Sequence, residues 1–230
     1  MEKQRILIVD DEEDIRDLLE IYLVNEGYCV IKSEDGIEAL DVLEREEIDL
    51  IILDVMMPKM DGIQACMKIR KDKNVPIIML SAKGEDIDKI LGLNTGADDY
   101  VTKPFNPLEI VARVKSQLRR CTMITEHKEI KSEEIEIGGL RINTATHQVK
   151  VDELEIKLTP TEFSILEFLA RNRGRVLSTK LIYESVWNEP AYESESTVAV
   201  HIRNIREKIE INPKDPKYIK VVWGVGYKVG

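Results

Sequence analysis

Acidic side chains gather at the ends of two short apolar runs in the first half of the chain. The run RILIV, residues 5–9, leads directly into Asp10 and Asp11, and DLIIL, residues 49–53, leads into Asp54. Carboxylates held this close repel one another, so they either take up protons or bind a cation. Mg²⁺ suits such a group, because it binds a few carboxylates and keeps water or phosphate oxygens as its other ligands. The pattern therefore predicts a magnesium site at these run ends.

Two more polar side chains end later apolar runs. Ser81 follows PIIML, residues 76–80, and Lys103 closes YVTK. In a parallel sheet the carboxyl ends of the strands lie at one edge, where ligands bind. If the strand order is flavodoxin-like, the first, third, fourth and fifth runs are neighbours. Three carboxylates, a lysine and a serine then converge at that edge.

The first half alternates between two kinds of sequence pattern that could form such a sheet. Short β-branched runs at 5–9, 28–32, 49–53, 76–80 and 100–102 precede helical patterns at 13–26, 36–46, 61–71, 85–94 and 106–120. Five strand–helix repeats predict an α/β fold with a parallel sheet covered on both faces. The nearly continuous apolar runs agree with this, since central parallel strands are buried on both sides.

The second half has a different organisation. Apolar periodicity fades over CTMITEHKEIKS, residues 121–132, and short alternating runs follow near 134–142, 147–151 and 154–158. Helical patterns cover 160–172, 178–187 and 195–210, and YIKVVWGVGYKV predicts a terminal hairpin. We expect a first domain at residues 1–121, a linker at 122–132, and an α+β domain at 133–230.

Composition narrows the class of protein. The 230 residues carry a net charge of −10, are 43% hydrophobic, and contain no apolar run long enough to cross a membrane. Residues 1–120 hold 26 acidic and 17 basic side chains, whereas residues 200–230 hold three acidic and seven basic ones. This division suggests different partners for the two halves. Three scattered cysteines and the absence of a signal-like N-terminus favour a reduced, cytoplasmic setting.

The motifs VDD, LDVMMPKMDG, LSAK and DDYVTKPF, in this order and spacing, resemble the receiver domain of two-component response regulators. The resemblance implies that Asp54 is the phosphoacceptor and takes its phosphoryl group from a sensor histidine kinase. It implies Mg²⁺ bound by Asp11, Asp54 and the Met56 carbonyl, with Asp10 in support. It also implies phosphoryl contacts from Lys103 and Ser81, a switch through Tyr100, and a cis peptide bond between Lys103 and Pro104.

An enzyme of small-molecule metabolism is the rival interpretation of the same carboxylates. Aspartyl phosphatases and phosphotransferases use an acid–base aspartate two residues beyond the nucleophile, and this chain has Met56 there. We therefore expect a phosphoacceptor protein and no enzyme activity of that kind.

The chain from residue 89 to residue 120 is rich in opposite charges and resembles the dimerising surface of the OmpR/PhoB family. The resemblance implies a two-fold receiver dimer on phosphorylation, which a self-complementary surface allows. Solvated surface pairs, worth about 0–1 kcal/mol each, are the alternative. The expected pairs are Lys89–Glu109, Asp99–Arg113 and Asp98–Arg120.

The helical pattern at 195–210 has one apolar stripe, formed by Val198, Ile202, Ile205 and Ile209. Its other side could read a major groove or could simply be solvated. LTPTEFSILEFLARNRGRVLSTKLIYESVW, TVAVHIRNIREKI and VVWGVGYKV resemble the winged helix-turn-helix domain of the same family, which favours DNA binding. We expect DNA bases to be contacted by Val200, Asn204 and Arg206. The phosphate backbone of the DNA should be contacted by His201, Arg203, Lys208, Lys220 and Lys228.

Two positions depart from the family pattern. In many relatives the wing tip is Arg–Gly and the arginine enters the minor groove. This chain has Trp223–Gly224 there, so it lacks that arginine contact, and the tryptophan could pack against the domain instead. Well-studied relatives also have a basic residue where this chain has Asn204, which predicts a changed base preference.

Together these features predict a phosphorylation-activated transcription factor, weakly similar to VanR-like regulators. Its expected partners are a sensor kinase, promoter DNA with tandem half-sites, RNA polymerase and a second copy of the chain. We expect no membrane association. Two alternatives stay open: constitutive DNA binding with the receiver as a dimer module, and an interaction protein whose C-terminal domain is inert.

Overall fold

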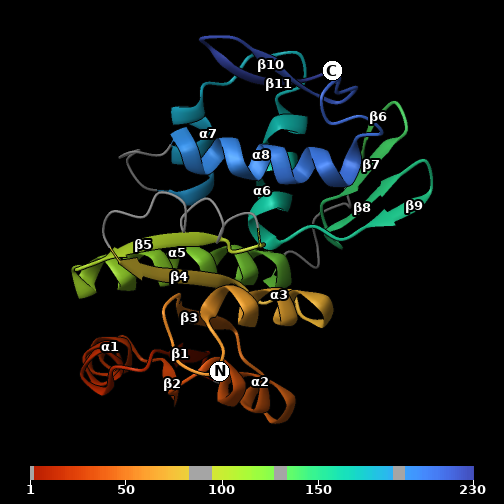
Figure 1. The fold of residues 1–230 in the computed structure, drawn as a ribbon. Helices are drawn as coiled ribbons and strands as arrows, with labels where there is room; N and C mark the ends of the chain where they lie inside the picture. Colours follow the sequence, from red (N-terminus) through yellow and green to blue (C-terminus); the bar gives the residue numbers. More distant parts are fainter. Residues whose placement is uncertain (1–2, 83–94, 127–133, 189–194) are drawn as a thin grey trace. The chain divides into compact units, whose positions relative to one another are not determined.

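The computed structural model describes the backbone of residues 3–82, 95–126, 134–188 and 195–230. The chain divides into two compact units, Met1–Leu118 and Arg119–Gly230 (Figure 1). None of the helices within the described ranges is long and apolar enough to cross a bilayer.

The first unit is a parallel five-stranded sheet in the order β2-β1-β3-β4-β5. This is the flavodoxin-like order that the sequence predicts, and the strands lie within two residues of the predicted runs. The predicted helix at 85–94 falls outside the described residues. The elements are β1 Arg5–Val9, α1 Glu13–Asn25, β2 Cys29–Ser33, α2 Gly36–Arg45, β3 Leu50–Asp54, α3 Gly62–Asp72, β4 Ile77–Ala82, β5 Asp99–Lys103 and α5 Pro107–Glu126.

Alternation along the strands builds a core on each face of the sheet. On one face, Ile8, Ile52 and Leu80 pack with Leu19 of α1 and Ile110 of α5. The intervening strand residues point to the opposite face, where α2 and α3 lie (Figure 1). Helix α5 continues to Glu126, within the segment 122–132 that the sequence predicts to be a linker.

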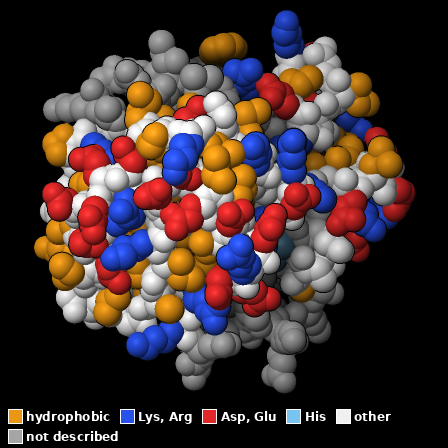
Figure 2. Space-filling view, turned by 60° about the horizontal axis from the view of Figure 1, so that its bottom comes forward, with side chains coloured by type: hydrophobic (Ala, Val, Ile, Leu, Met, Phe, Trp, Pro, Cys, Tyr) orange, Lys and Arg blue, Asp and Glu red, His pale blue; other side chains and the backbone are white. Residues whose placement is uncertain are grey.

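Charged side chains cover the outside of this unit in opposite-sign groups. Lys32 lies 2.9 Å from Asp17 and 2.6 Å from Glu20, and both carboxylates come from α1. In Figure 2, basic and acidic side chains are interspersed on the face shown rather than gathered by sign. Exposed pairs of this kind add little stability because water and salt screen them, so the buried core carries most of the stability.

The second unit combines a four-stranded antiparallel sheet, three helices and a hairpin. The first predicted run, 134–142, is divided into two strands by a turn at Gly138, whose φ of 61° suits glycine. The helices and the hairpin form where the sequence predicts them. The elements are β6 Glu134–Ile137, β7 Leu140–Asn143, β8 Gln148–Val151, β9 Leu154–Ile156, α6 Pro160–Arg171, α7 Thr179–Trp187, α8 Glu195–Ile209, β10 Ile219–Val222 and β11 Gly226–Val229.

Helix α8 is held at the centre of the second unit by its predicted stripe. Val198, Ile202, Ile205 and Ile209 are all buried in one core with residues of α6 and α7. Helix α6 begins with a capping box, in which Thr159 and Glu162 bond to each other's backbone amides. The helix-turn-helix pair α7–α8 therefore rests on a complete core, and the opposite side of α8 is left for other contacts.

Candidate functional site

The strand register brings the predicted acidic and basic residues to one edge of the parallel sheet. Asp54, the last residue of β3, lies opposite Leu80, so Ser81 is one residue further along β4. Lys103, the last residue of β5, lies opposite Ala82. Asp10 follows β1, which pairs with β3 on its other side. The convergence that the sequence predicts is therefore confirmed by the sheet.

Lys103 ties the cluster together. Its Nζ lies 2.8 Å from an oxygen of Asp10 and 2.9 Å from an oxygen of Asp54. Asp10 is fully buried, Asp54 is 3% exposed, and Asp11 is exposed. One oxygen from each of these three carboxylates lies within 4.8 Å of the others. The site is thus formed by two buried carboxylates and a half-buried lysine, with a third carboxylate at its solvent side.

Burial shifts the acid–base properties of these groups. Burial raises the pKa of Asp54 to about 6, although its bond to Lys103 opposes the rise, and burial also raises the pKa of Asp10. For Lys103, burial alone would lower the pKa, but its bonds to Asp10 and Asp54 outweigh burial and raise it. At neutral pH, Asp54 is therefore an ionised carboxylate with little water around it, which makes it a good nucleophile.

The loop after β3 is fixed by a close backbone contact. An ideal Cβ added to Gly62 would lie 2.0 Å from the Asp54 carbonyl oxygen, so only glycine allows α3 to begin this near to β3. The Met56 amide donates to Asp54 Oδ2 over 3.0 Å, and the Gly62 amide donates to the Val55 carbonyl. Asp54 is therefore held from both sides, by Lys103 and by its own loop.

The other predicted members of the site lie nearby. Ser81 is fully buried at the end of β4, and Tyr100 is only 7% exposed in β5. The Lys103–Pro104 peptide bond is cis, as the resemblance implies. The Met56 side chain is exposed, so only its backbone turns toward the cluster.

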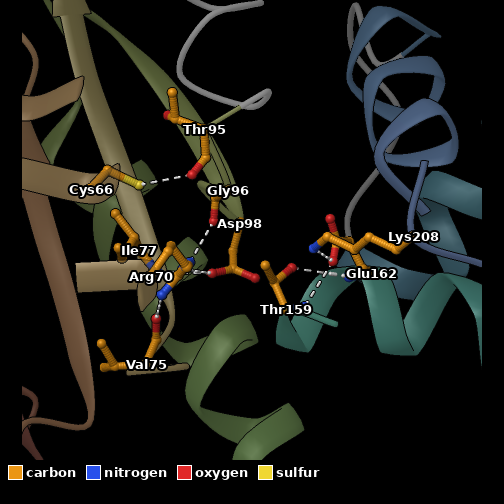
Figure 3. Close-up of polar contacts among 10 residues, drawn as sticks. All are labelled: Cys66, Arg70, Val75, Ile77, Thr95, Gly96, Asp98, Thr159, Glu162 and Lys208. Atoms are coloured by element: carbon orange, nitrogen blue, oxygen red, sulfur yellow. Dashed lines mark hydrogen bonds and ion pairs between the residues drawn. The ribbon is translucent and has the colours of Figure 1, made fainter. Parts of the chain in front are cut away.

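The described residues among those expected at a dimer surface are paired within the chain. Arg113 Nη1 lies 2.8 Å from Asp99, and Arg113 Nη2 lies 2.8 Å from Glu109. Asp98 is fully buried and accepts from Arg70 Nη2 at 2.7 Å and from the Ile77 amide at 3.0 Å (Figure 3). Because Asp98 is fully buried, its contact with a second copy would require the surrounding chain to rearrange. Lys89 and the side chain of Arg120 lie outside the described residues.

The outward side of α8 carries fewer of the predicted DNA contacts than expected. Arg203 is exposed, with 64% of its side chain accessible, and pairs with Glu207 at 2.9 Å. Val200 is half-buried next to it. Both can reach a ligand that approaches this side of the helix.

Two predictions for α8 are wrong because the core stripe is broader than four residues. His201 is 1% exposed and packs its ring 5.7 Å from that of Trp187, and Asn204 is 6% exposed. Position 201 lies three residues after Val198 and four before Ile205, which places it on the core side of a helix. This spacing in the sequence could have shown that His201 is buried. His201 and Asn204 therefore position α8 instead of touching DNA.

Arg206 is also engaged inside the domain, contrary to prediction, whereas Lys208 is exposed and pairs with a buried carboxylate of α6. Arg206 donates to the Ile219 carbonyl through Nε at 3.0 Å and Nη2 at 2.8 Å. Lys208 Nζ lies 2.5 Å from Glu162, which is 1% exposed (Figure 3). These two cations hold α8 against the hairpin and against α6.

The hairpin presents the remaining predicted contacts. Lys220 is exposed and lies opposite the half-buried Lys228. Trp223, at the turn, is 88% exposed, so the suggestion that it packs against the domain is wrong.

Replacing Asp54 by asparagine should stabilise the protein in metal-free buffer at pH 7. Because the folded pKa of about 6 exceeds the ordinary value of 3.8, ionisation of Asp54 opposes folding increasingly above the ordinary pKa of 3.8 and to its full extent above pH 6. The full shift corresponds to roughly 3 kcal/mol, and we expect a gain of about 2 kcal/mol because Lys103 loses a partner. The gain should shrink as the pH falls from 6 to 4, where wild-type Asp54 is protonated.

Calorimetric unfolding of the full chain in EDTA measures this difference. Asp61→Asn is the matched control, because Asp61 caps α3 outside the cluster and asparagine also caps helices. A gain for Asp54→Asn that does not change between pH 4 and pH 7 would contradict the explanation.

Comparison with known protein families agrees with this geometry. Residues 6–115 match the family described as response regulator receiver domain, and residues 153–229 match the family described as transcriptional regulatory protein, C terminal. The two matches fall in the two compact units.

Relatives and solved structures span both units. The chain is 50% identical over 226 residues to the regulatory protein VanR of Enterococcus faecium, covering 98% of each chain. It is 48% identical over 231 residues to the alkaline phosphatase synthesis transcriptional regulatory protein PhoP of Bacillus subtilis (strain 168), covering 98% of this chain and 96% of PhoP.

Among solved structures, a single-substitution mutant of RitR matches 99% of each chain with a TM-score of 0.77 and 31% identity. The response regulator DrrB, a Thermotoga maritima OmpR/PhoB homologue, matches 99% of each chain with a TM-score of 0.53 and 34% identity. With its parallel-sheet receiver and its winged-helix DNA-binding domain, the chain belongs to the OmpR/PhoB family of two-component response regulators that control transcription.

Proposed function

We propose that Asp54 accepts a phosphoryl group from a histidine of a sensor kinase, and that this modification controls receiver pairing and promoter binding. The observation that carries the proposal is the buried Asp54 carboxylate, held by Lys103 beside Asp10 at the carboxyl edge of the sheet. Such a group is a poor structural element, since two buried carboxylates share one cation, and a good nucleophile.

The proposed transfer forms a bond between an Asp54 oxygen and phosphorus, and it breaks the bond from phosphorus to the imidazole nitrogen of the kinase. The freed imidazole leaves as the neutral base or takes a proton from water. Lys103 is placed to neutralise charge on the phosphoryl oxygens. The product carries more negative charge and more acceptor atoms than a carboxylate, and Ser81 and Lys103 are the side chains placed to meet them.

The acidic cluster fits Mg²⁺. Oxygens of Asp10, Asp11 and Asp54 lie together, they are the hard ligands that Mg²⁺ prefers, and Asp11 faces solvent, where water can complete the shell. We assign Asp11, Asp54 and the Met56 carbonyl as ligands, with Asp10 in support. When bound, the ion would neutralise charge on the phosphoryl group during transfer.

Of the residues predicted to contact DNA, we keep in the proposal four whose side chains a ligand can reach. Val200 and Arg203 on α8 face outward, and Lys220 and Lys228 lie on the hairpin. We propose that α8 enters the major groove, as the second helix of a helix-turn-helix does. A protein that binds promoter DNA and receives a phosphoryl group from a kinase would act in the cytoplasm.

Phosphorylation should depend on Asp54. Incubation of the full chain with acetyl phosphate and Mg²⁺ should add one phosphoryl group, seen by intact mass spectrometry, and Asp54→Asn should prevent it because the attacking oxygen is lost. Asp61→Asn should be labelled like the wild type. Normal labelling of Asp54→Asn would refute the assignment.

Dimerisation of the phosphorylated chain should depend on Arg113, which we propose to link two receivers together with Asp99. We expect Arg113→Ala to raise the dimer dissociation constant roughly fivefold or more, as the loss of about 1 kcal/mol implies. Sedimentation with beryllofluoride as the phosphoryl mimic measures this. Arg45→Ala, at the exposed end of α2, is the control. Equal constants for both variants would favour a surface pair without a role in dimerisation.

DNA affinity should depend on Arg203 without regard to sequence. Arg203→Ala should weaken all duplexes similarly and reduce the salt dependence of binding by about one ion, as expected for a phosphate contact. Arg171→Ala is a matched control, because Arg171 also pairs with a glutamate four residues away at 2.9 Å. A loss confined to some sequences would instead indicate base contact.

The same titration of the wild type, with and without beryllofluoride, separates the gated from the constitutive interpretation. Tighter binding with the mimic supports gating by Asp54. Equal and tight binding would mean that the receiver does not control the DNA-binding domain.

A further inference from the structure

The loop between β3 and α3, residues 55–61, contains a lysine in a conformation that lysine disfavours. Lys59 has a φ of 63°, in the left-handed region that residues other than glycine rarely adopt. The same loop contains Met56, whose amide donates to Asp54 Oδ2 over 3.0 Å and whose carbonyl we assign as a Mg²⁺ ligand. A disfavoured backbone conformation persists only where the surrounding structure holds it. The side-chain contacts of Lys59 supply that hold.

Lys59 reaches from this loop to the loop between β2 and α2. Its Nζ lies 2.6 Å from Asp35 Oδ2 and 3.1 Å from Glu34 Oε1. The Asp35 side chain is 3% exposed, and its Oδ1 caps α2 by accepting from the amides of Ile37 and Glu38. The bond from Lys59 holds the pKa of Asp35 below its usual value, so this carboxylate is charged at neutral pH. We call the contact between Lys59 and Asp35 the loop link.

The far end of the loop link is next to the acidic cluster. Ser33, the last residue of β2, accepts at its carbonyl from the Asp10 amide over 3.2 Å. Asp35 follows two residues later in the chain. The loop link therefore joins the segment beside Asp10 to the loop that begins after Asp54, and these are the two buried carboxylates of the site.

The start of α2 also packs against the loop between β3 and α3. An ideal Cβ added to Gly36 would lie 2.9 Å from the Met60 carbonyl oxygen and 3.0 Å from the Ala65 Cβ, so α2, the loop and α3 are in close contact here. Met57 and Met60 are buried, whereas Met56 is 63% exposed. Apolar contacts thus anchor the loop against α2, and the loop link adds a charged contact between the same two segments.

We propose that Lys59 is a positioning residue for the Mg²⁺ site: by its bond to Asp35 it fixes the loop that carries the Met56 carbonyl, so that this ligand is in place before the ion binds. The inference rests on the proposed function, because it takes the assigned Mg²⁺ ligands as given. Groups that orient metal ligands without touching the metal commonly change its affinity by about 10- to 100-fold. A ligand set ordered in advance also loses less entropy on binding.

The direction of the effect separates positioning from simple charge. A lysine repels a cation, so charge alone predicts that Lys59→Met strengthens Mg²⁺ binding and that Asp35→Asn weakens it. Positioning predicts that both variants weaken binding, because either one frees the loop. Asparagine also caps helices, so Asp35→Asn keeps the start of α2. Because both changes break the same contact, the double variant should bind about as well as either single variant.

Calorimetric titration of the full chain with Mg²⁺ measures these affinities. We expect Lys59→Met to raise the dissociation constant roughly tenfold, and Lys59→Arg to stay near the wild type because arginine keeps the charge and the donors. Lys59→Gly should bind as weakly as Lys59→Met, although glycine suits the φ of 63°, which excludes backbone strain as the cause. Lys68→Met, the same charge change at an exposed position of α3, should bind like the wild type.

Hydrogen exchange in metal-free buffer gives a readout that does not depend on the ion. The Met56 amide, which is bonded to Asp54, should exchange faster in Lys59→Met than in the wild type. Amides in the middle of β3, such as that of Ile52, should exchange as before. This difference separates local release of the loop from a general loss of stability.

Labelling by acetyl phosphate separates binding of the ion from the transfer step. At saturating Mg²⁺, Lys59→Met should be labelled at nearly the wild-type rate, because Asp54 and Lys103 are intact. At low Mg²⁺ it should be labelled more slowly than the wild type.

Two outcomes would overturn the positioning role and leave the phosphoacceptor proposal standing, provided that the wild type binds Mg²⁺ and is labelled on Asp54. One is unchanged or tighter Mg²⁺ binding by Lys59→Met, and the other is unchanged exchange of the Met56 amide. If Lys59→Met does not fold, Lys59→Gly and Asp35→Asn give the same comparison. Failure of the wild type to bind Mg²⁺ would refute the magnesium assignment together with this inference.

Discussion

The contact of Lys103 with both Asp10 and Asp54 is the interaction on which the first domain's chemistry depends. Two buried carboxylates beside each other are unstable in a protein interior unless a cation offsets them. The lysine can do this only because β5 lies next to β4, which in turn lies next to β3. Strand order and the tight approach of Gly62 both help to place three charged groups within bonding distance.

Ion pairs to buried carboxylates link distant segments in both units. Arg70 joins the end of α3 to Asp98, just before β5, and Lys208 joins the end of α8 to Glu162 at the start of α6. Breaking such a pair leaves a buried carboxylate without its cation, which destabilises the fold. Several basic residues that look available for DNA or for a second copy are therefore part of the internal framework.

The sequence predicted the receiver well because its strong signals are local. Apolar runs, helical periodicity and strand-end carboxylates located every described element of the parallel sheet, and the site then followed from the sheet's order. It predicted the DNA-facing residues poorly. A charged or polar residue such as Arg206 or Asn204 looks the same in sequence whether it meets solvent or a carbonyl of a later strand. That difference depends on how α8 packs between α6, α7 and the hairpin, which periodicity does not reveal.

The separation of inward and outward residues on α8 also bears on how such regulators diversify. Its inward residues, together with Arg206 and Lys208, secure the helix, whereas positions such as Ala199, Val200 and Arg203 have little part in the core. After gene duplication, a few substitutions at those outward positions and at the hairpin turn could redirect a copy to a new promoter without disturbing folding. The fold thus separates the residues that can drift from those that cannot, and new regulatory circuits can arise from small changes.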